Sequence, residues 1–430
     1  MARAAKKHHV IIGASAAGLA ALEAIRSVDR ECQVTVLSKE KRPLYSRVGL
    51  THFLDGTVRP AGMNTHGAEY FERLNARLLD GVAAVRVDPQ SRAVALSNRR
   101  TLRYDNLLVA SGSSAVIPPI PGVRLRGVYP CITRNDALAI DRALARARHV
   151  VVIGAGLIGI QAADAMVKRQ KRVAIVEQMP HVMPTMVDPA AARLFEDLLR
   201  EAGHTVRTGV QAAEIVGKAG RVSGVRLEGG DVLPGQVCIV AVGVRPNLEF
   251  LDGTRIQRRQ GVLVDATQQT NLKHVYAAGD VAETTDRFSG QRVVIAIWPE
   301  ALNQGRVAGL NMAGQPAMYE GSMAMNTTSV MGLPIASVGL WQVTDTAEYR
   351  IHSQLDALKR TYRKLVFKDD ALLGALLVGP GVNAEAGILH NIIRTRHAFT
   401  VRPDQLVAGA ITWGRILRDN RLAGAVGHPQ

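Results

Sequence analysis

Residues 149–177 combine a β-branched strand, a glycine-rich turn, a helix and a second strand, and this combination limits the folds open to the chain. The segment begins HVVVIGAGLIG, with Gly154, Gly156 and Gly159 in GxGxxG spacing, and its second strand, RVAIVE, ends at Glu177. In a parallel α/β unit, such a turn lets backbone N–H groups approach a pyrophosphate, and an acid at the end of the second strand binds the adenosine ribose. Glu177 would repel a 2′-phosphate, and the next two residues supply no arginine to bind one. The segment therefore predicts a site for NAD(H) rather than NADP(H).

The opening of the chain carries a less complete copy of the same pattern. Residues 10–18 read VIIGASAAG, which keeps Gly13 and Gly18 but has Ser15 at the middle position. Alone, this turn could equally be a tight contact between a strand and a helix without any ligand. The complete copy later in the chain favours a second dinucleotide site.

The residues after the first turn predict the rest of one nucleotide-binding domain. A second strand, QVTVLS, ends at Ser38, with Glu40 just beyond it. This is roughly 20 positions after the turn, where a dinucleotide fold contacts the ribose. Either residue could make that contact, and Glu40 could instead be a solvated loop charge. The segment KRPLYSRVGLTHFLDG then mixes aromatic, hydroxyl and arginine side chains, as in a loop that crosses a planar ligand, although an ordinary surface loop has the same composition.

Later segments complete this domain, insert a second and add a third. The strands VAAVRVD and RAVALS predict a hairpin, YDNLLVASGS returns to the first sheet, and the prolines of VIPPIPG mark a domain crossing. After the complete glycine motif and VCIVAVGVRPN, the strand VYAAG delivers Asp280, whose carboxylate could bind a polyol hydroxyl or cap a helix. From Met318 onward, short strands and helices around 386–395 and 405–415 predict an α+β domain. The predicted fold class is α/β, with two Rossmann-like dinucleotide-binding domains, one inserted in the other, and a C-terminal α+β domain.

Size, cysteine content and charge exclude several classes of protein. The chain has 430 residues, enough for two or three domains, and its three cysteines form no CxxC pair, which suits thiols in a reducing cytoplasm. The basic start resembles a signal peptide, but the apolar run after it contains the glycine turn, so secretion is rejected. No apolar stretch of about 18 residues predicts a membrane span. The net charge of +16 predicts acidic partners, while the short, dispersed basic runs make nucleic acid the less favoured one.

The order of these motifs resembles that of the pyridine nucleotide–disulfide oxidoreductases and their ferredoxin, rubredoxin and nitrite reductase relatives. The resemblance covers residues 10 to about 380 and rests on a GxSxxG turn, ASG before a proline-rich crossing, the inserted GxGxxG domain, VAVGVRPN, VYAAGDVA and WPEALNQG. It implies FAD in a domain formed by 1–115 and 245–317, NAD(H) in an inserted domain over 116–244, and an interface role for a domain over 318–430. Deleting the chain after about Pro316 would then be expected to abolish complex formation but, provided that the truncated protein folds, to spare dinucleotide binding.

The resemblance also implies roles for individual residues. Around FAD it places the pyrophosphate by Gly13, Ser15 and Gly18, the adenine by Ala84, Ala110 and Gly112, the flavin by Arg47 and Trp298, and the ribitol by Asp280. Around NAD(H) it places Gly154, Gly156, Ile158, Gly159, Glu177 and Gly243. Because the cofactors carry the hydride chemistry, no protein side chain is expected to act as a general acid or base.

Two departures from the family pattern decide the expected function. Disulfide reductases and NADH oxidases of this type have a reactive cysteine in the loop that reads PLYSRVGL here, and this loop has none. Gln161 stands where the family tends to have Glu. With no thiol to reduce, the flavin electrons are expected to pass to or from an iron–sulfur partner. The YSR loop and the long C-terminal domain resemble the NAD-binding flavoprotein subunits of oxo-acid and aldehyde oxidoreductases, such as phenylglyoxylate dehydrogenase and tungsten aldehyde oxidoreductase.

Two alternatives stay open at this point. The chain could be a stand-alone NADH:ferredoxin or rubredoxin reductase that acts on a diffusible carrier. It could also be a basic, nucleic-acid-binding flavoprotein resembling apoptosis-inducing factor, in which redox chemistry is secondary.

Overall fold

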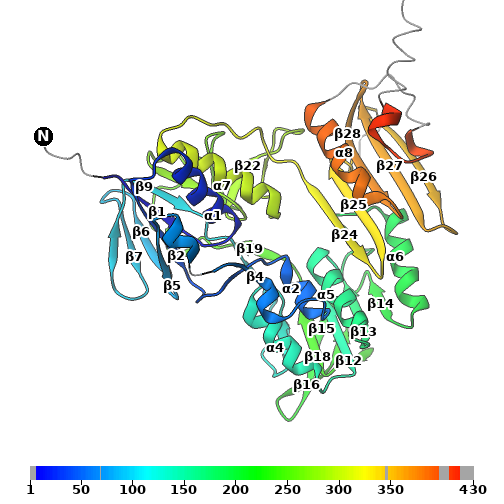
Figure 1. Cartoon of the computed structure of the whole chain (residues 1–430). Helices are drawn as coiled ribbons and strands as arrows, with labels where there is room; N and C mark the ends of the chain where they lie inside the picture. Colours follow the sequence, from blue (N-terminus) through cyan, green and yellow to red (C-terminus); the bar gives the residue numbers. More distant parts are fainter. Residues whose placement is uncertain (1–5, 68, 344–346, 397–405, 417–430) are drawn as a thin grey trace, which may run out of the picture. The chain divides into compact units, whose positions relative to one another are not determined.

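The computed structural model describes residues 6–67, 69–343, 347–396 and 406–416, and the chain divides into two compact units. The first unit consists of Met1–Phe53, Val58–Ala115 and Val244–Ser322. The second consists of Leu54–Thr57, Val116–Gly243 and Met323–Gln430. Figure 1 labels many of the elements of both units.

The first unit is built on a five-stranded parallel sheet with the strand order β21-β9-β1-β2-β5. The strands are β1 (His8–Ile12), β2 (Gln33–Ser38), β5 (Arg77–Asp80), β9 (Asn106–Val109) and β21 (Val275–Ala277). Most of their residues are apolar and buried, as expected for a parallel sheet that is covered on both faces. One face packs on helices α1 (Ala16–Val28) and α7 (Trp298–Ala313). The other face packs on an antiparallel meander of β6 (Ala84–Asp88), β7 (Ala93–Leu96) and β8 (Thr101–Arg103), which confirms the predicted hairpin.

Glycines let α7 lie directly on α1, and Figure 1 shows the two helices side by side. A Cβ at Gly305 would lie 2.2 Å from the carbonyl oxygen of Ala17, and one at Gly309 would lie 2.4 Å from that of Ala21. Any side chain at these positions would therefore force the helices apart and displace the start of α7.

Short elements connect these layers. They are β3 (Leu44–Tyr45), α2 (Gly49–Leu54), η1 (Pro60–Met63), β4 (Asn64–His66), α3 (Glu69–Arg73), β10 (Ser113–Ala115), β19 (Val244–Pro246), η2 (Glu249–Leu251), β20 (Val262–Leu263), β22 (Ala282–Thr285) and β23 (Arg292–Val293). The segment that we expected to be one loop after Pro43 is partly ordered as β3 and α2, because Leu44, Leu50, Phe53 and Leu54 are buried and draw the backbone onto the core.

The second unit begins with the same plan. Its parallel sheet has the order β11-β18-β12-β13-β14, formed by β11 (Val128–Pro130), β12 (His149–Ile153), β13 (Arg172–Glu177), β14 (Thr205–Thr208) and β18 (Val237–Val240). Helices α4 (Arg134–Leu144), α5 (Leu157–Lys168) and α6 (Pro189–Glu201) accompany it, with a meander of β15 (Ala212–Lys218), β16 (Arg221–Leu227) and β17 (Val232–Pro234). Local signals start the helices as capping rules predict. Thr133 and Asp136 form a capping box at α4, and the Asp188 side chain accepts a bond from the N–H of Ala191 at α6.

The C-terminal domain completes the second unit. Its antiparallel sheet has the order β24-β25-β28-β27-β26, from β24 (Met325–Val330), β25 (Leu333–Gly339), β26 (Arg350–Asp356), β27 (Thr361–Lys368) and β28 (Ala371–Val378), and α8 (Val382–Thr395) packs on it. The second helix predicted here, around 405–415, is interrupted: residues 406–407 and 413–416 are helical and 408–412 are not, while residue 405 lies outside the described residues. Instead of continuing a helix, the N–H of Ile411 donates to the Glu385 carboxylate, at 3.0 Å.

Among the described residues, no helix combines the length and the apolar character needed to cross a membrane.

Candidate dinucleotide sites

The turn after β1 has the geometry that close packing of a strand on a helix requires. Gly13 has φ +124°, and a Cβ there would lie 2.0 Å from the carbonyl oxygen of Ala110. A Cβ at Gly18, in the first turn of α1, would lie 1.9 Å from the carbonyl oxygen of Gly13. Ser15 is the N-cap of α1, but its side chain makes no capping hydrogen bond. The positive end of the helix is therefore left to an anion such as a pyrophosphate.

Ser113 joins two of the expected flavin-site residues. Its hydroxyl donates to Asp280 Oδ2 at 2.7 Å, and its carbonyl oxygen accepts a bond from Arg47 Nη1 at 3.3 Å. Ser113 itself is buried. No motif in the sequence marks Ser113, although it directly follows the ASG signature that ends at Gly112. Gly112 has φ +66°, and a Cβ there would meet no atom within 4 Å, so the backbone is open on this side.

Asp280 is also fixed from α7. The N–H of Gly279 donates to Gln304 Oε1 at 2.8 Å, which ties the turn after β21 to the helix that begins at Trp298. Trp298 is half-buried and packs against the α1/α7 core. The structure thus connects Arg47, Asp280 and the helix of Trp298 through Ser113 and Gln304. Ala84 lies elsewhere in the unit, half-buried at the start of β6.

Ser38 and Glu40 lie at the carboxyl end of β2, as the sequence predicted. The Ser38 hydroxyl donates to the backbone oxygen of Glu40 at 2.6 Å. The Glu40 carboxylate is half-buried and accepts a hydrogen bond from the Tyr45 hydroxyl, at 2.8 Å to one oxygen. The Glu40 side chain is therefore fixed by this hydrogen bond and is not freely solvated.

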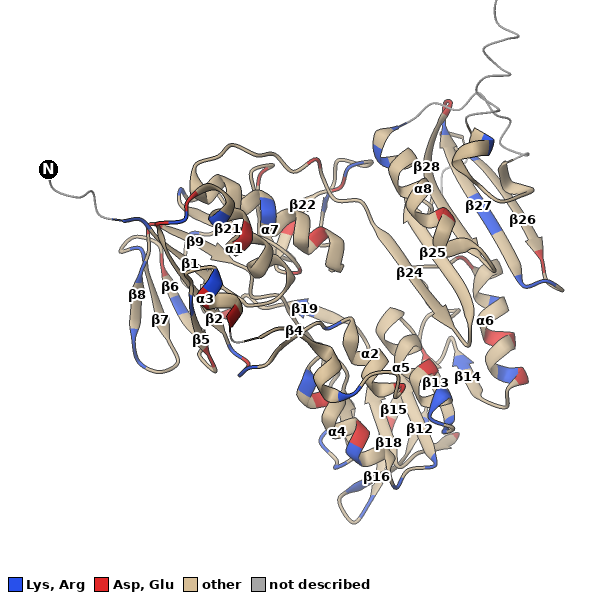
Figure 2. Cartoon of the chain, viewed as in Figure 1, with Lys and Arg blue, Asp and Glu red and all other residues tan. Residues whose placement is uncertain are grey.

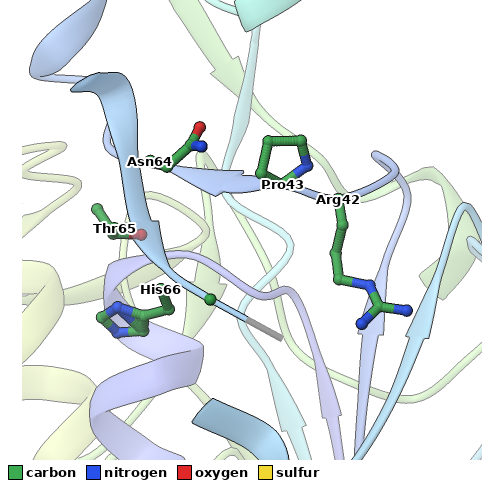
Figure 3. Close-up of a pocket in the computed structure, with 6 residues that line it drawn as sticks. Arg42, Pro43, Asn64, Thr65 and His66 are labelled. Atoms are coloured by element: carbon green, nitrogen blue, oxygen red, sulfur yellow. The ribbon is translucent and has the colours of Figure 1, made fainter. Parts of the chain in front are cut away.

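A pocket of about 510 Å³ opens in the same unit beside β3 and β4. Figure 3 shows it between Arg42 and Pro43 on one side and Asn64, Thr65 and His66 on the other, with the Arg42 and His66 side chains pointing away from each other. Arg42 also pairs with Asp80 at 3.3 Å. None of the expected cofactor residues lines this pocket, so its polar groups do not define the dinucleotide site.

The turn after β12 repeats the first one with an additional opening. Gly154 has φ +94°, and a Cβ at Gly159 would lie 1.9 Å from the carbonyl oxygen of Gly154, the same distance as in the first turn. Gly156 is the N-cap of α5, and a Cβ there would meet nothing within 4 Å. The middle glycine therefore serves no packing contact and leaves free space before the helix N-terminus, as a pyrophosphate needs. Gly243 is similarly open, with φ +114°.

Glu177 is anchored to this turn by both of its carboxylate oxygens. One accepts the N–H of Ala155 at 2.6 Å, and the other accepts the N–H of Met179 at 2.9 Å. The residue is buried at the end of β13, and each oxygen keeps a further lone pair that could accept a hydroxyl. Ile158 is half-buried in the first turn of α5. This arrangement fits a dinucleotide whose ribose lies beside Glu177.

Two such turns in one chain, each on a parallel sheet and each open at a helix N-terminus, define an oxidoreductase of the two-dinucleotide class. The chain belongs to the pyridine nucleotide-disulphide oxidoreductase family, whose family model matches residues 7–305. A second family model, the rubredoxin NAD+ reductase C-terminal domain, matches residues 325–393. Membership confirms the predicted fold class and identifies the protein as an enzyme that uses FAD and NAD(H).

Individual relatives agree with this family. The subunit epsilon of NADH-dependent phenylglyoxylate dehydrogenase from Aromatoleum evansii is 32% identical over 411 residues, which are 95% of this chain and 96% of that protein. The rubredoxin-NAD(+) reductase of Pseudomonas putida is 29% identical over 306 residues, 71% of this chain and 80% of that protein. Among solved structures, the NAD-dependent persulfide reductase from A. fulgidus has a TM-score of 0.86 and 27% identity, and the match covers 97% of this chain and 83% of that one.

The three cysteines, Cys32, Cys131 and Cys238, are free and buried. Burial raises the pKa of all three thiols, to about 12 for Cys131 and Cys238. Thiolate formation is therefore suppressed in each of them.

Gln161, at the position of the family's Glu, donates from Nε2 to Thr328 Oγ1 of β24 at 3.0 Å. Within the described residues, no group of His, Cys, Asp and Glu side chains could hold a metal ion.

Proposed function

We propose that this protein is the NAD(H)-binding flavoprotein subunit of an oxo-acid or aldehyde oxidoreductase complex, and that it exchanges electrons between NAD(H) and an iron–sulfur partner. The observation that carries this proposal is the segment 43–50, PLYSRVGL, which lacks a cysteine, while all three thiols of the chain are buried elsewhere. When bound, FAD would supply hydride exchange with NADH and the onward transfer of single electrons. Because no thiol of this chain is placed to take them, an external carrier must do so.

The residues described above are assigned to the two cofactors under this proposal. Gly13, Ser15 and Gly18 admit the FAD pyrophosphate to the start of α1, Ser38 or Glu40 binds the ribose, and Asp280 binds the ribitol, with Arg47, Trp298, Ala84, Ala110 and Gly112 around the rings. Gly154, Gly156, Ile158, Gly159 and Gly243 surround NAD(H), and Glu177 binds its 2′-hydroxyl. We likewise propose three domains. The FAD domain consists of 1–115 and 245–317, the NAD(H) domain of 116–244, and the C-terminal interface domain of 318–430.

Charge and similarity support an iron–sulfur partner. The net charge of +16 would attract an acidic electron carrier, and Figure 2 shows lysines and arginines on elements throughout both units, with acidic residues among them. The relative from Aromatoleum evansii is named as a subunit of an NADH-dependent dehydrogenase, and the match extends over nearly all of both chains. The three free cysteines fit a reducing compartment, and we propose the cytoplasm.

Affinity purification of the tagged chain from its native host tests the proposal. We expect a yellow protein that reduces ferricyanide with NADH and that brings with it a subunit containing iron and acid-labile sulfide. Only the assembled complex is expected to reduce NAD+ with a 2-oxo acid or an aldehyde.

The two alternatives predict other outcomes of the same experiment. A chain that purifies alone and rapidly reduces added rubredoxin or ferredoxin is a stand-alone reductase. A chain that purifies alone, reduces neither carrier and binds a DNA duplex with a steep salt dependence is a nucleic-acid-binding flavoprotein.

A further inference from the structure

One face of α5 connects three parts of the chain that are far apart in sequence. Gln161, Asp164 and Lys168 follow one another at spacings of three and four residues, so they share this face. Gln161 bonds to Thr328, and Asp164 Oδ1 accepts the N–H of Met331 at 2.6 Å, in the turn between β24 and β25. The middle of the helix is therefore fastened to the C-terminal domain.

The end of the same helix holds a segment that belongs in sequence to the other half of the molecule. Lys168 Nζ lies 3.0 Å from Asp164 Oδ2 and 3.2 Å from Asp55 Oδ2. Arg169, the C-cap of α5, donates from Nη1 to the carbonyl oxygen of Leu54 at 3.2 Å. Residues 54–57 accordingly group with the second unit, while the chain on both sides of them belongs to the first.

The charged side chains of this cluster, Lys168, Asp55 and Asp164, stabilise one another by ion pairing. The side chains of Asp55 and Asp164 are only 6% and 7% exposed, whereas that of Lys168 is 47% exposed. Burial opposes ionisation of Asp55, but its bonds from Thr57 and Lys168 keep the pKa of the carboxyl below its ordinary value. Burial likewise opposes the charge on Lys168, but the two carboxylates raise its pKa. Lys168 is the only cation among the described residues that pairs with both buried carboxylates, so its loss would leave two charges uncompensated.

The position of the cluster along the chain suggests its role. Helix α5 has 12 residues, so the cluster lies about 18 Å from the helix start at Gly156, where the NAD(H) pyrophosphate is assigned. On the other side, Asp55 directly follows α2, which begins two residues after Arg47 of the assigned flavin loop. The cluster touches neither cofactor site, but it is covalently continuous with elements of both.

We propose that Lys168 is a positioning residue for hydride transfer, because its pairs with Asp55 and Asp164 tie the flavin-loop segment to the helix that starts the NAD(H) site and, through Asp164, to the C-terminal domain. This role relies on the cofactor assignments but not on an iron–sulfur partner. Breaking the tie leaves each cofactor site intact and loosens only the alignment of the reacting rings. Small misplacements are costly in such reactions, up to about 100-fold for about 1 Å.

Anaerobic stopped-flow reduction of the bound FAD by NADH tests the role. We expect Lys168→Met to lower the limiting rate of flavin reduction about 5- to 50-fold, with FAD content and the Kd of NAD+ unchanged. Asp55→Asn should act similarly, and the double variant should be no slower than Lys168→Met, because both changes break one link. Lys168→Arg should retain most of the rate.

The control is Lys218→Met, at an exposed lysine of β15 that makes no ion pair among the described residues, and it should keep the wild-type rate. Since Lys168 is half-exposed, rising ionic strength should slow the wild type but not Lys168→Met. An unchanged limiting rate in Lys168→Met, or additive effects of the two single changes, overturns the proposal. Loss of FAD or of NAD+ affinity in these variants would also overturn it, because the cluster would then support cofactor binding and not only the alignment of the rings. If Lys168→Met does not accumulate as folded protein, the limiting rate of flavin reduction in Asp55→Asn, which leaves α5 unaltered, tests the proposal in the same way.

Discussion

Replacing Glu177 with glutamine should measurably lower kcat/KM for NADH. In the assigned site the carboxylate accepts a ribose hydroxyl, and a hydrogen bond to a charged group contributes about 1.5–3 kcal/mol. At about 1.4 kcal/mol per factor of ten, Glu177→Gln should lower kcat/KM for NADH by roughly 10- to 150-fold. The rate with NADPH should not fall in parallel, because the repulsion of its 2′-phosphate is removed at the same time. Stopped-flow reduction of the flavin with each nucleotide measures both effects.

The same change also affects stability, and a second buried glutamate separates the two effects. In Glu177→Gln, one amide N–H must face the N–H of Ala155 or Met179, which costs about 1–3 kcal/mol of unfolding free energy. Glu196 has the same 7% exposure and accepts the N–H of Val182 at 3.2 Å, so Glu196→Gln should be comparably destabilised but keep wild-type use of NADH. An equal fall in kcat/KM for NADH and NADPH in Glu177→Gln would refute the assignment of the ribose to this side chain.

Three further predictions concern FAD, pH and the thiols. Ser113→Ala removes the donor to Asp280, so FAD affinity, measured by titrating the apoprotein, should fall about 10-fold or more for a lost charged hydrogen bond; unchanged affinity would exclude a role for this link. Burial, and next the charge of Lys7, lowers the pKa of His9 to about 4, so the folded state binds fewer protons than the unfolded one, and the unfolding free energy should decline as the pH falls from about 6.5 towards 4. His9→Phe should flatten that part of the profile in urea titrations, and an unaltered slope would contradict the buried neutral imidazole. A variant with all three cysteines replaced by alanine should keep NADH-to-dye electron transfer, whereas loss of flavin reoxidation with FAD still bound would restore a thiol mechanism.

The sequence predicted those parts of the site whose requirements are local. Gly13 and Gly154 occupy turns where a side chain would overlap a backbone carbonyl, and Glu177 ends a strand next to such a turn, so spacing alone identified them. Seven of the ten strands in the two parallel sheets were also predicted, because runs of buried apolar residues need no partner to be recognised. The other three, β5, β11 and β14, were missed, because they are short and have only one buried residue among them.

Residues whose role depends on distant partners were not predictable in this way. Ser113 is important because it bonds to both Arg47 and Asp280, two residues that are far apart in the sequence. Lys168 and Asp55 are 113 residues apart and carry no motif. The helix missed within the loop after Pro43 forms because tertiary burial overrides the weak local signal.

The C-terminal domain is bonded at several points to the domain that we assign to NAD(H), so it does not form a removable module. Besides the bond from Met331 to Asp164, the Tyr362 hydroxyl donates to Asp188 Oδ2 at 2.7 Å, and Lys364 Nζ lies 3.4 Å from the same oxygen. Deletion after Pro316 would remove these partners, so Asp188 would lose its cation, while Asp164 would lose the N–H of Met331 but keep its pair with Lys168. The expectation that such a truncation spares dinucleotide binding applies only if the truncated protein folds, and the loss of these contacts should destabilise it. We expect the truncated protein to lose NAD+ affinity or to unfold near room temperature, as followed by NAD+ titration and thermal denaturation, while Tyr362→Phe, which removes one bond, should cost only about 1–3 kcal/mol. A truncated protein that binds NAD+ with wild-type affinity and melts at the wild-type temperature would show that these contacts contribute nothing to the dinucleotide site.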